Sequence, residues 1–213
     1  NNDGITNALV NGDVVTVVIT SSITCTTCSA ATSSGITRTV SGITFANVTL
    51  AASPTGTTCS GNNVTYTATP TAGGATPTYE FFVNAISVQG PGASATYSYA
   101  PVNNDVITVV MTSSSGCAIG SPATSNAITA VVNPTPAAPT ITAGGATTFC
   151  NGGSVTLTSS YAGAGNQWYK DNVLQVLETN DNIVVTTSGS YTVVYTALGC
   201  PSAASAAEVV TVN

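Results

Sequence analysis

The chain has 213 residues, 5% of them charged, and a net charge of −6 because eight acidic residues accompany only two basic ones. Nucleic acid is not an expected partner, since two cationic side chains cannot form the basic surface that such binding needs. Membrane insertion is not expected either, because no apolar run approaches the ~20 residues of a membrane helix. Histidine is absent, which excludes Ser-His-Asp and Cys-His catalysis, so we expect no enzyme activity and no cofactor.

Residue usage favours an all-β protein. Threonine and valine, which are abundant, are β-branched and suit pleated, half-buried surfaces, while scattered glycine, proline and asparagine supply turns. No segment has apolar residues at helical spacing over three turns.

The first part of the chain contains an internal repeat. The stretch "VVTVVITSSITCTTCSAATSSGIT" from Val14 to Thr37 matches, without a gap, "VITVVMTSSSGCAIGSPATSNAIT" from Val106 to Thr129. Residues 1–40 hold no early cysteine and no core aromatic residue. We therefore expect them to be the C-terminal part of an incomplete unit, with only its late strands and with its front half outside this sequence.

Residues 41–133 contain a full set of strand patterns. The segment "VTYTAT" places Val64, Tyr66 and Ala68 on one face and threonines on the other, as a half-buried strand requires. The segment "YEFFVN" follows and supplies Phe81 as the expected core aromatic residue. A second strong strand, "DVITVVMT", then leads into a Gly-Cys turn and a last strand ending at Asn133.

Residues 134–213 repeat this order after the proline-rich linker "NPTPAAPT", which favours a stiff, extended backbone. The segments "VTLTSS", "NQWYKD" and "GSYTVVYT" match the three strands above, and Trp168 takes the place of Phe81. Short strands between frequent turns, in the order Cys, aromatic, Cys, indicate an immunoglobulin-like β-sandwich. The sequence thus predicts tandem immunoglobulin-like domains in a linear array, divided as 1–40, 41–133 and 134–213.

Six cysteines suggest a disulfide framework. Cys59 with Cys117 and Cys150 with Cys200 enclose similar strand-rich stretches, so we predict one structural disulfide per domain, near one end of each sandwich. Disulfides of this kind place the protein in an oxidising, extracytoplasmic compartment. A zinc site lacks a second pair of ligands.

Cys25 and Cys28 are the two cysteines without a predicted partner in this sequence. Cys25 aligns with Cys117 and is expected to pair with an upstream cysteine. Cys28 pairs with Cys25, pairs outside the sequence, or is free. The "CTTC" motif lacks the βαβ context of a redox site.

Two weaker candidates for a binding site remain. Calcium could bind Asp3 and Asp13, or the second set Asp171, Glu178 and Asp181, but neither spacing matches a calcium loop, so we predict ordinary turns and no metal site. Phe82 and Tyr169 could stack on sugars. Packing contacts are the preferred interpretation, because isolated surface aromatic residues are normal.

The stretches "FFVNAISVQGPGASATYSYAPVNNDVITVVMTSSSGCAIGSPATSNAITAVVNPTP" and "FCNGGSVTLTSSYAGAGNQWYKDNVL" carry a family resemblance. They resemble the tandem immunoglobulin-like and PKD-like repeats of very large flavobacterial (Bacteroidota) cell-surface proteins. These include proteins similar to the gliding-motility adhesins exported by type IX secretion. The resemblance implies a structural repeat of an extracellular, cell-surface adhesin or filament and brings no catalytic residues.

The implied partners are neighbouring repeats of the same protein or other copies of the chain, with surface glycans and secretion-system components as further candidates. Two alternatives stay open. One is a polymerising filament subunit completed by strands of a neighbouring chain. The other is a carbohydrate-binding module, which predicts a row of exposed aromatic residues that the sequence does not clearly contain.

Overall fold

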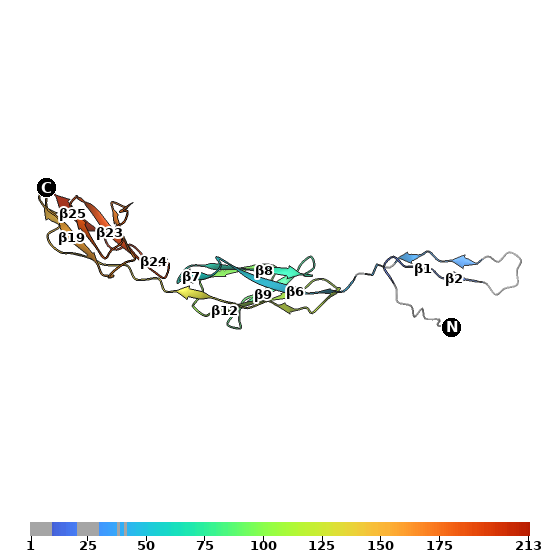
Figure 1. Cartoon of the computed structure of the whole chain (residues 1–213). Helices are drawn as coiled ribbons and strands as arrows, with labels where there is room; N and C mark the ends of the chain where they lie inside the picture. Colours follow the sequence, from blue (N-terminus) through green and yellow to red (C-terminus); the bar gives the residue numbers. More distant parts are fainter. Residues whose placement is uncertain (1–9, 21–29, 38, 41) are drawn as a thin grey trace.

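The computed structural model describes residues 10–20, 30–37, 39–40 and 42–213. Within these residues the secondary structure is strand and turn, with no α-helix, which confirms the all-β class. The described residues include no helical segment that could span a lipid bilayer. Two separate hydrophobic clusters define two β-rich units, which follow one another in an elongated molecule (Figure 1).

The first unit consists of two antiparallel sheets that face each other. One sheet has the strand order β11-β8-β6, and the other has the order β10-β9-β12, with β14 and β15 both paired to β12. A short strand, β7, pairs in parallel with β16. The strands are β5 (Thr44–Phe45), β6 (Asn47–Ser53), β7 (Thr57–Cys59), β8 (Val64–Thr71), β9 (Thr78–Val83), β10 (Ile86–Gly92), β11 (Thr96–Tyr99), β12 (Val106–Thr112), β13 (Ala118–Ile119), β14 (Ala123–Thr124), β15 (Ile128–Thr129) and β16 (Val131–Asn133).

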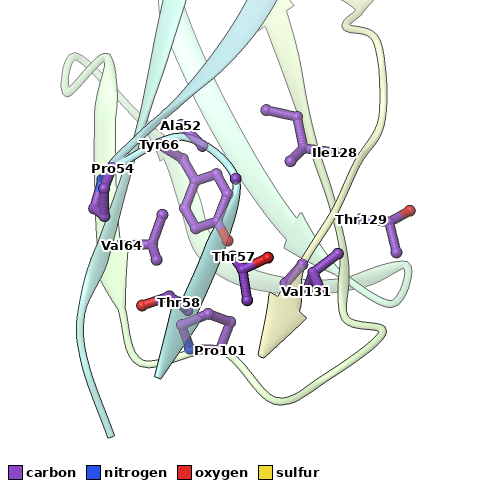
Figure 2. Close-up of a pocket in the computed structure, with 12 residues that line it drawn as sticks. Ala52, Pro54, Thr57, Thr58, Val64, Tyr66, Pro101, Ile128, Thr129 and Val131 are labelled. Carbon is purple, nitrogen blue, oxygen red and sulfur yellow. The ribbon is translucent and has the colours of Figure 1, made fainter. Parts of the chain in front are cut away.

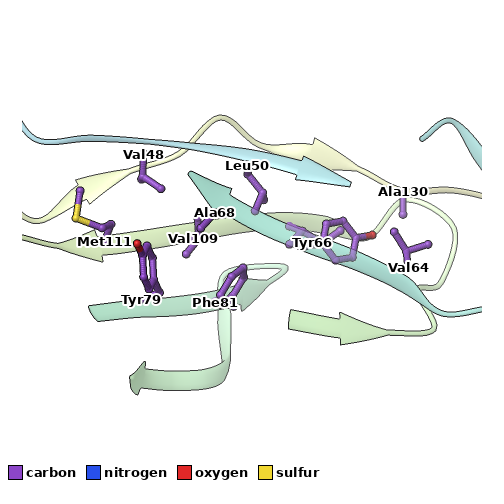
Figure 3. Packing of buried hydrophobic residues seen from close by; sticks show 11 residues of the cluster. Val48, Leu50, Val64, Tyr66, Ala68, Tyr79, Phe81, Val109, Met111 and Ala130 are labelled. Atoms are coloured by element: carbon purple, nitrogen blue, oxygen red, sulfur yellow. The ribbon is translucent and has the colours of Figure 1, made fainter. Parts of the chain in front are cut away.

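The core of the first unit lies between these sheets (Figure 3). Burial alternates along β12, where Ile107, Val109 and Met111 are fully buried and their neighbours are not. Phe81 on β9 is fully buried too, as predicted, and Tyr66 on β8 belongs to the same buried cluster. The period-two pattern of the sequence therefore sets which face of each strand is in the core.

The second unit repeats this plan with sheets β17-β19-β22 and β18-β25-β23-β20-β21. Trp168 on β20 is fully buried, as predicted, and its Nε1 donates to the carbonyl of Asn180 at 3.0 Å. The strands are β17 (Ile141–Ala143), β18 (Thr148–Phe149), β19 (Val155–Ser159), β20 (Asn166–Lys170), β21 (Val173–Leu174), β22 (Asn182–Val185), β23 (Gly189–Ala197), β24 (Cys200–Pro201) and β25 (Glu208–Val212).

Both units have the strand arrangement of an immunoglobulin-type sandwich. In the first unit β6, β8 and β11 form one sheet, and β9, β10 and β12 with β14 and β15 form the other. In the second unit the corresponding sheets are β17, β19 and β22, and β20, β21, β23 and β25. The second unit also contains a tyrosine corner, because Tyr191 on β23 donates its hydroxyl to the carbonyl of Thr187 at 2.9 Å. The predicted immunoglobulin-like fold is thus confirmed by strand order and by this local bond.

The described part of residues 10–40 forms a narrow two-stranded ribbon. Strand β1 (Val14–Val15) pairs with β4 (Ile36–Thr37), and β2 (Val18–Ile19) pairs with β3 (Ala31–Thr32). Ser33 Oγ accepts from the amide of Val17 at 3.0 Å, just as Ser125 Oγ accepts from Val109 at 3.1 Å in the first unit. The ribbon therefore reproduces the last two strands of a unit, as the repeat predicts.

The predicted disulfide pairs are wrong. The structure joins Cys59 to Cys200, in different units, while Cys117 and Cys150 are free, exposed thiols. In the first unit Cys59 lies beside Asn133 at one end of β12 and Cys117 follows its other end, about 23 Å away for a seven-residue strand.

Cys150 and Cys200 are likewise separated by β23, whose nine residues span about 30 Å. A disulfide needs Cα atoms about 4.4–6.8 Å apart, so neither predicted pair can form. Cys25 and Cys28 lie outside the described residues.

Candidate functional site

The candidate site is the junction between the two units, where several polar contacts gather around one disulfide. Cys59 ends β7 of the first unit, and Cys200 begins β24 of the second. Cys200 is 1% exposed. It follows a tight turn in which Leu198 and Gly199 have positive φ angles of 52° and 79°. The turn therefore lies at the end of the second unit that contacts the first, next to the disulfide.

Asn133 connects the same turn to the first unit. Its Nδ2 donates to the carbonyl of Leu198 at 2.8 Å, and its own carbonyl accepts from the amide of Ser60 at 2.9 Å. Asn133 is also the register partner of Cys59 in the β7–β16 pair. A non-covalent contact therefore lies directly beside the covalent one.

The linker that follows Asn133 is tied down on both sides. Thr135 Oγ1 donates to the carbonyl of Ser60 at 3.0 Å, in the first unit. Tyr161 of the second unit donates its hydroxyl to the carbonyl of Ala137 at 3.3 Å, and its ring stacks on that of Tyr195 with centroids 4.1 Å apart. Because linker, side chain and disulfide all bridge the units, bending at this point must break several contacts at once.

A small cavity of about 170 Å³ lies near this end of the first unit (Figure 2). Thr57 and Val131, on the β7–β16 pair, form one side, and the core residues Val64 and Tyr66 form the other. Burial raises the pKa of Tyr66, and the negative charge of Asp105 raises it further by a smaller amount. The lining contains no carboxylate or thiol, so the cavity offers no set of groups for acid–base or nucleophilic chemistry.

Asp105 is a structural carboxylate at a turn. It accepts from the amide of Val102 at 2.9 Å, from Asn84 Nδ2 at 2.8 Å and from the hydroxyl of Tyr99 at 3.2 Å. Burial acts to raise the pKa of Asp105, but these three hydrogen bonds outweigh it and lower the pKa below its usual value. The pKa of Tyr99 lies far above its usual range, mainly because the ring is buried and secondly because the negative charge of Asp105 is near.

The remaining acidic candidates also lie in turns. Asp13 accepts from the amide of Val10 at 2.8 Å, which repeats the bond between Asp105 and Val102. Asp171 accepts from the amide of Ser190 at 2.9 Å. Across the described ranges no three acids, cysteines or histidines gather into a possible metal site, Glu178 and Asp181 included, while Asp3 lies outside those ranges.

The aromatic candidates do not form a platform. Phe82 on β9 and Tyr169 on β20 are both half-buried, and they belong to different units. The junction itself was not predicted from the sequence. One signal was the Gly-Cys step after a strong strand, whose cysteine was assigned to a bridge within its own unit.

Comparisons with known proteins add little to this description. No family profile matches the chain, and no curated protein does. Among solved structures, the chain is similar to the human OSCAR ligand-binding domain at 16% identity, with 77% of this chain and 98% of that chain covered and a TM-score of 0.32. This likeness is too weak to carry an argument, so the fold assignment rests on strand order.

Proposed function

We propose that this chain is a structural repeat segment of an extracellular cell-surface adhesin or filament. The observation that supports it best is the Cys59–Cys200 bond, which joins one immunoglobulin-type unit to the next beside a doubly tethered linker. A rod of stiffly joined sandwiches can hold a distant binding surface away from a cell. A disulfide between units also suits an oxidising, extracytoplasmic setting.

Under this proposal the role is mechanical, without catalysis, and its purpose is surface attachment or gliding. The resemblance to flavobacterial repeat proteins and their type IX secretion supports that purpose. Partners are then neighbouring repeats, with glycans or secretion components bound elsewhere in the protein.

Antibody labelling of whole cells tests the proposal. Antibodies raised against residues 41–213 should bind intact cells and decorate extended surface structures seen by electron microscopy. Protease treatment of intact cells should remove the signal. Labelling that requires permeabilised cells would contradict an extracellular location, and a cytoplasmic protein labelled in parallel checks that the cells are intact.

A polymerising subunit is the second candidate, and one observation favours it. Val17 and Ile19 of the ribbon are 59% and 68% exposed, while the repeat-equivalent Val109 and Met111 are fully buried. The ribbon thus presents core residues that strands of a neighbouring chain could cover. Mixing two differently tagged preparations and isolating one tag should recover both if chains complete each other, and only one tag if they do not.

A further inference from the structure

The C-terminal end of the second unit repeats the half of the junction that the first unit contributes. Strand β18 pairs in parallel with β25, as β7 pairs with β16, and Cys150 follows β18 as Cys59 ends β7. The amide of Asn151 donates to the carbonyl of Asn213 at 2.9 Å, matching the 2.9 Å bond from Ser60 to Asn133.

The local turn after each cysteine also matches. The carbonyl of Cys150 accepts from the amide of Gly153 at 3.0 Å, and the carbonyl of Cys59 accepts from the amide of Asn62 at 3.0 Å. The two ends therefore agree in strand pairing, in the asparagine beside the cysteine, and in the turn that follows. They differ in the bonding of the cysteine, because Cys59 forms a disulfide with the next unit and Cys150 is an exposed thiol.

The first unit carries a free Gly-Cys cysteine of the type that Cys59 bonds in the second unit. Its Gly116-Cys117 step follows β12 just as Gly199-Cys200 follows β23, and Cys117 is exposed and free. The amide of Thr44, at the start of the unit, donates to the carbonyl of Cys117 at 3.1 Å. A Gly-Cys step at the N-terminal end is thus common to both units: its cysteine is disulfide-bonded in the second unit and a free thiol in the first.

We propose that Cys150 forms a disulfide with the Gly-Cys thiol of the next unit of the same polypeptide, so that the Cys59–Cys200 junction recurs along the array. This inference rests on the proposed function, since it requires a further repeat. Formation of the bond takes one proton and one electron from each thiol. The two electrons and two protons reduce the disulfide of a thiol–disulfide exchange oxidant to its dithiol form.

Disulfide mapping of the native polypeptide tests this inference. The protein is denatured without reductant in N-ethylmaleimide, digested with pepsin in acid, where thiolate exchange is slow, and analysed by tandem mass spectrometry. The Cys150 peptide should carry no label before reduction and should be linked to a Gly-Cys peptide from outside residues 1–213. The Cys59–Cys200 link in the same digest is the positive control.

Three results would overturn the inference: labelled Cys150, a link from Cys150 to Cys117 of another copy, or a link to a cysteine outside a Gly-Cys step. The Cys150→Ser variant gives a second measurement. It should make one Gly-Cys thiol newly reactive to N-ethylmaleimide while Cys59–Cys200 persists, and no gain of label would contradict the pairing.

Intact mass separates this inference from the proposed function. A mass many times the 21.0 kDa of this chain with a free Cys150 would overturn only the recurring disulfide. A non-reduced native mass near 21.0 kDa would remove both the larger repeat protein and the next unit that the inference needs.

Discussion

The carboxylate of Asp105 illustrates how single residues stabilise a unit with few charges. It accepts hydrogen bonds from Tyr99 at the end of β11 and Val102 in the connection to β12, and from Asn84 in the turn after β9, so it joins these two segments. Replacing it with alanine should lower the free energy of unfolding of that unit by about 1–2 kcal/mol, at the lower end because the side chain is partly solvated. Hydrogen exchange of β8 and β12 measures the change, and Glu80→Ala, whose carboxylate accepts one bond from Ser87, is the control.

The same group predicts a pH dependence. Because the folded-state pKa of Asp105 is lowered, its contribution is present above its unfolded-state pKa of about 3.9 and is lost as the pH falls through the folded value. The first unit should therefore lose protection from hydrogen exchange as the pH falls below about 4. Asp105→Asn should flatten that loss, and an unchanged acid profile in this variant would contradict the assignment.

In the second unit the tyrosine corner offers a separate residue-scale prediction. Tyr191→Phe keeps the buried ring but removes the bond to Thr187, so we expect a loss of about 1 kcal/mol. Urea unfolding followed by the fluorescence of Trp168, the single tryptophan, reports on this unit alone. Tyr195→Phe, which keeps the ring stacked on Tyr161, is the matched control and should change stability less.

Residue-scale features differ in how far the sequence predicts them. Phe81 and Trp168 could be assigned to the core because the alternation of apolar side chains is a local property of a strand. Disulfide partners could not be assigned, because enclosure in sequence does not give distance in space. Cys59 is 141 residues from Cys200 yet bonded to it, while the nearer Cys117 lies a strand length away.

At the scale of elements, strands β1 to β4 of the ribbon have the same pairing as β12 with β14 and β15, but in different surroundings. Val17 and Val109 are repeat-equivalent, but Val17 is 59% exposed and Val109 is fully buried. The ribbon therefore keeps the strand pairing of a unit, although no opposing sheet covers it among the residues that the structure describes.

This contrast predicts unequal effects of one substitution at two places. Val109→Ala should destabilise the first unit by about 2 kcal/mol, because it removes buried methyl groups and leaves a cavity. Val17→Ala should have almost no effect on this chain. Urea unfolding of the two variants measures the difference. Equal losses would mean that the ribbon has a packing partner within the chain.

Strand positions were largely predictable, because turn residues and period-two patterns mark them in the sequence. The parallel β7–β16 and β18–β25 pairs were not. Each joins the beginning of a unit to its end through two or three residues, too short a run to show a pattern.

At the scale of the whole molecule, the two units are joined by a chain connection and a disulfide that lie close together. In the chain-entropy model, a disulfide that closes the 141-residue loop from Cys59 to Cys200 stabilises the folded chain by about 5 kcal/mol. Each unit, however, already has its own hydrophobic core. The larger consequence should be for orientation, since a second covalent connection removes the bending that a single linker permits.

Single-molecule energy transfer between dyes on Cys117 and Cys150 tests this account most directly, because these exposed thiols lie toward the outer ends of the two units. The reference protein carries Cys25→Ser and Cys28→Ser so that only these two sites are labelled, and a second variant adds Cys59→Ser and Cys200→Ser. Fluorescence of Trp168 confirms that the second unit is folded in both. We predict a narrow transfer distribution in the reference protein and a broad one without the disulfide. Equal widths in the two proteins would contradict a rod held rigid at its junction.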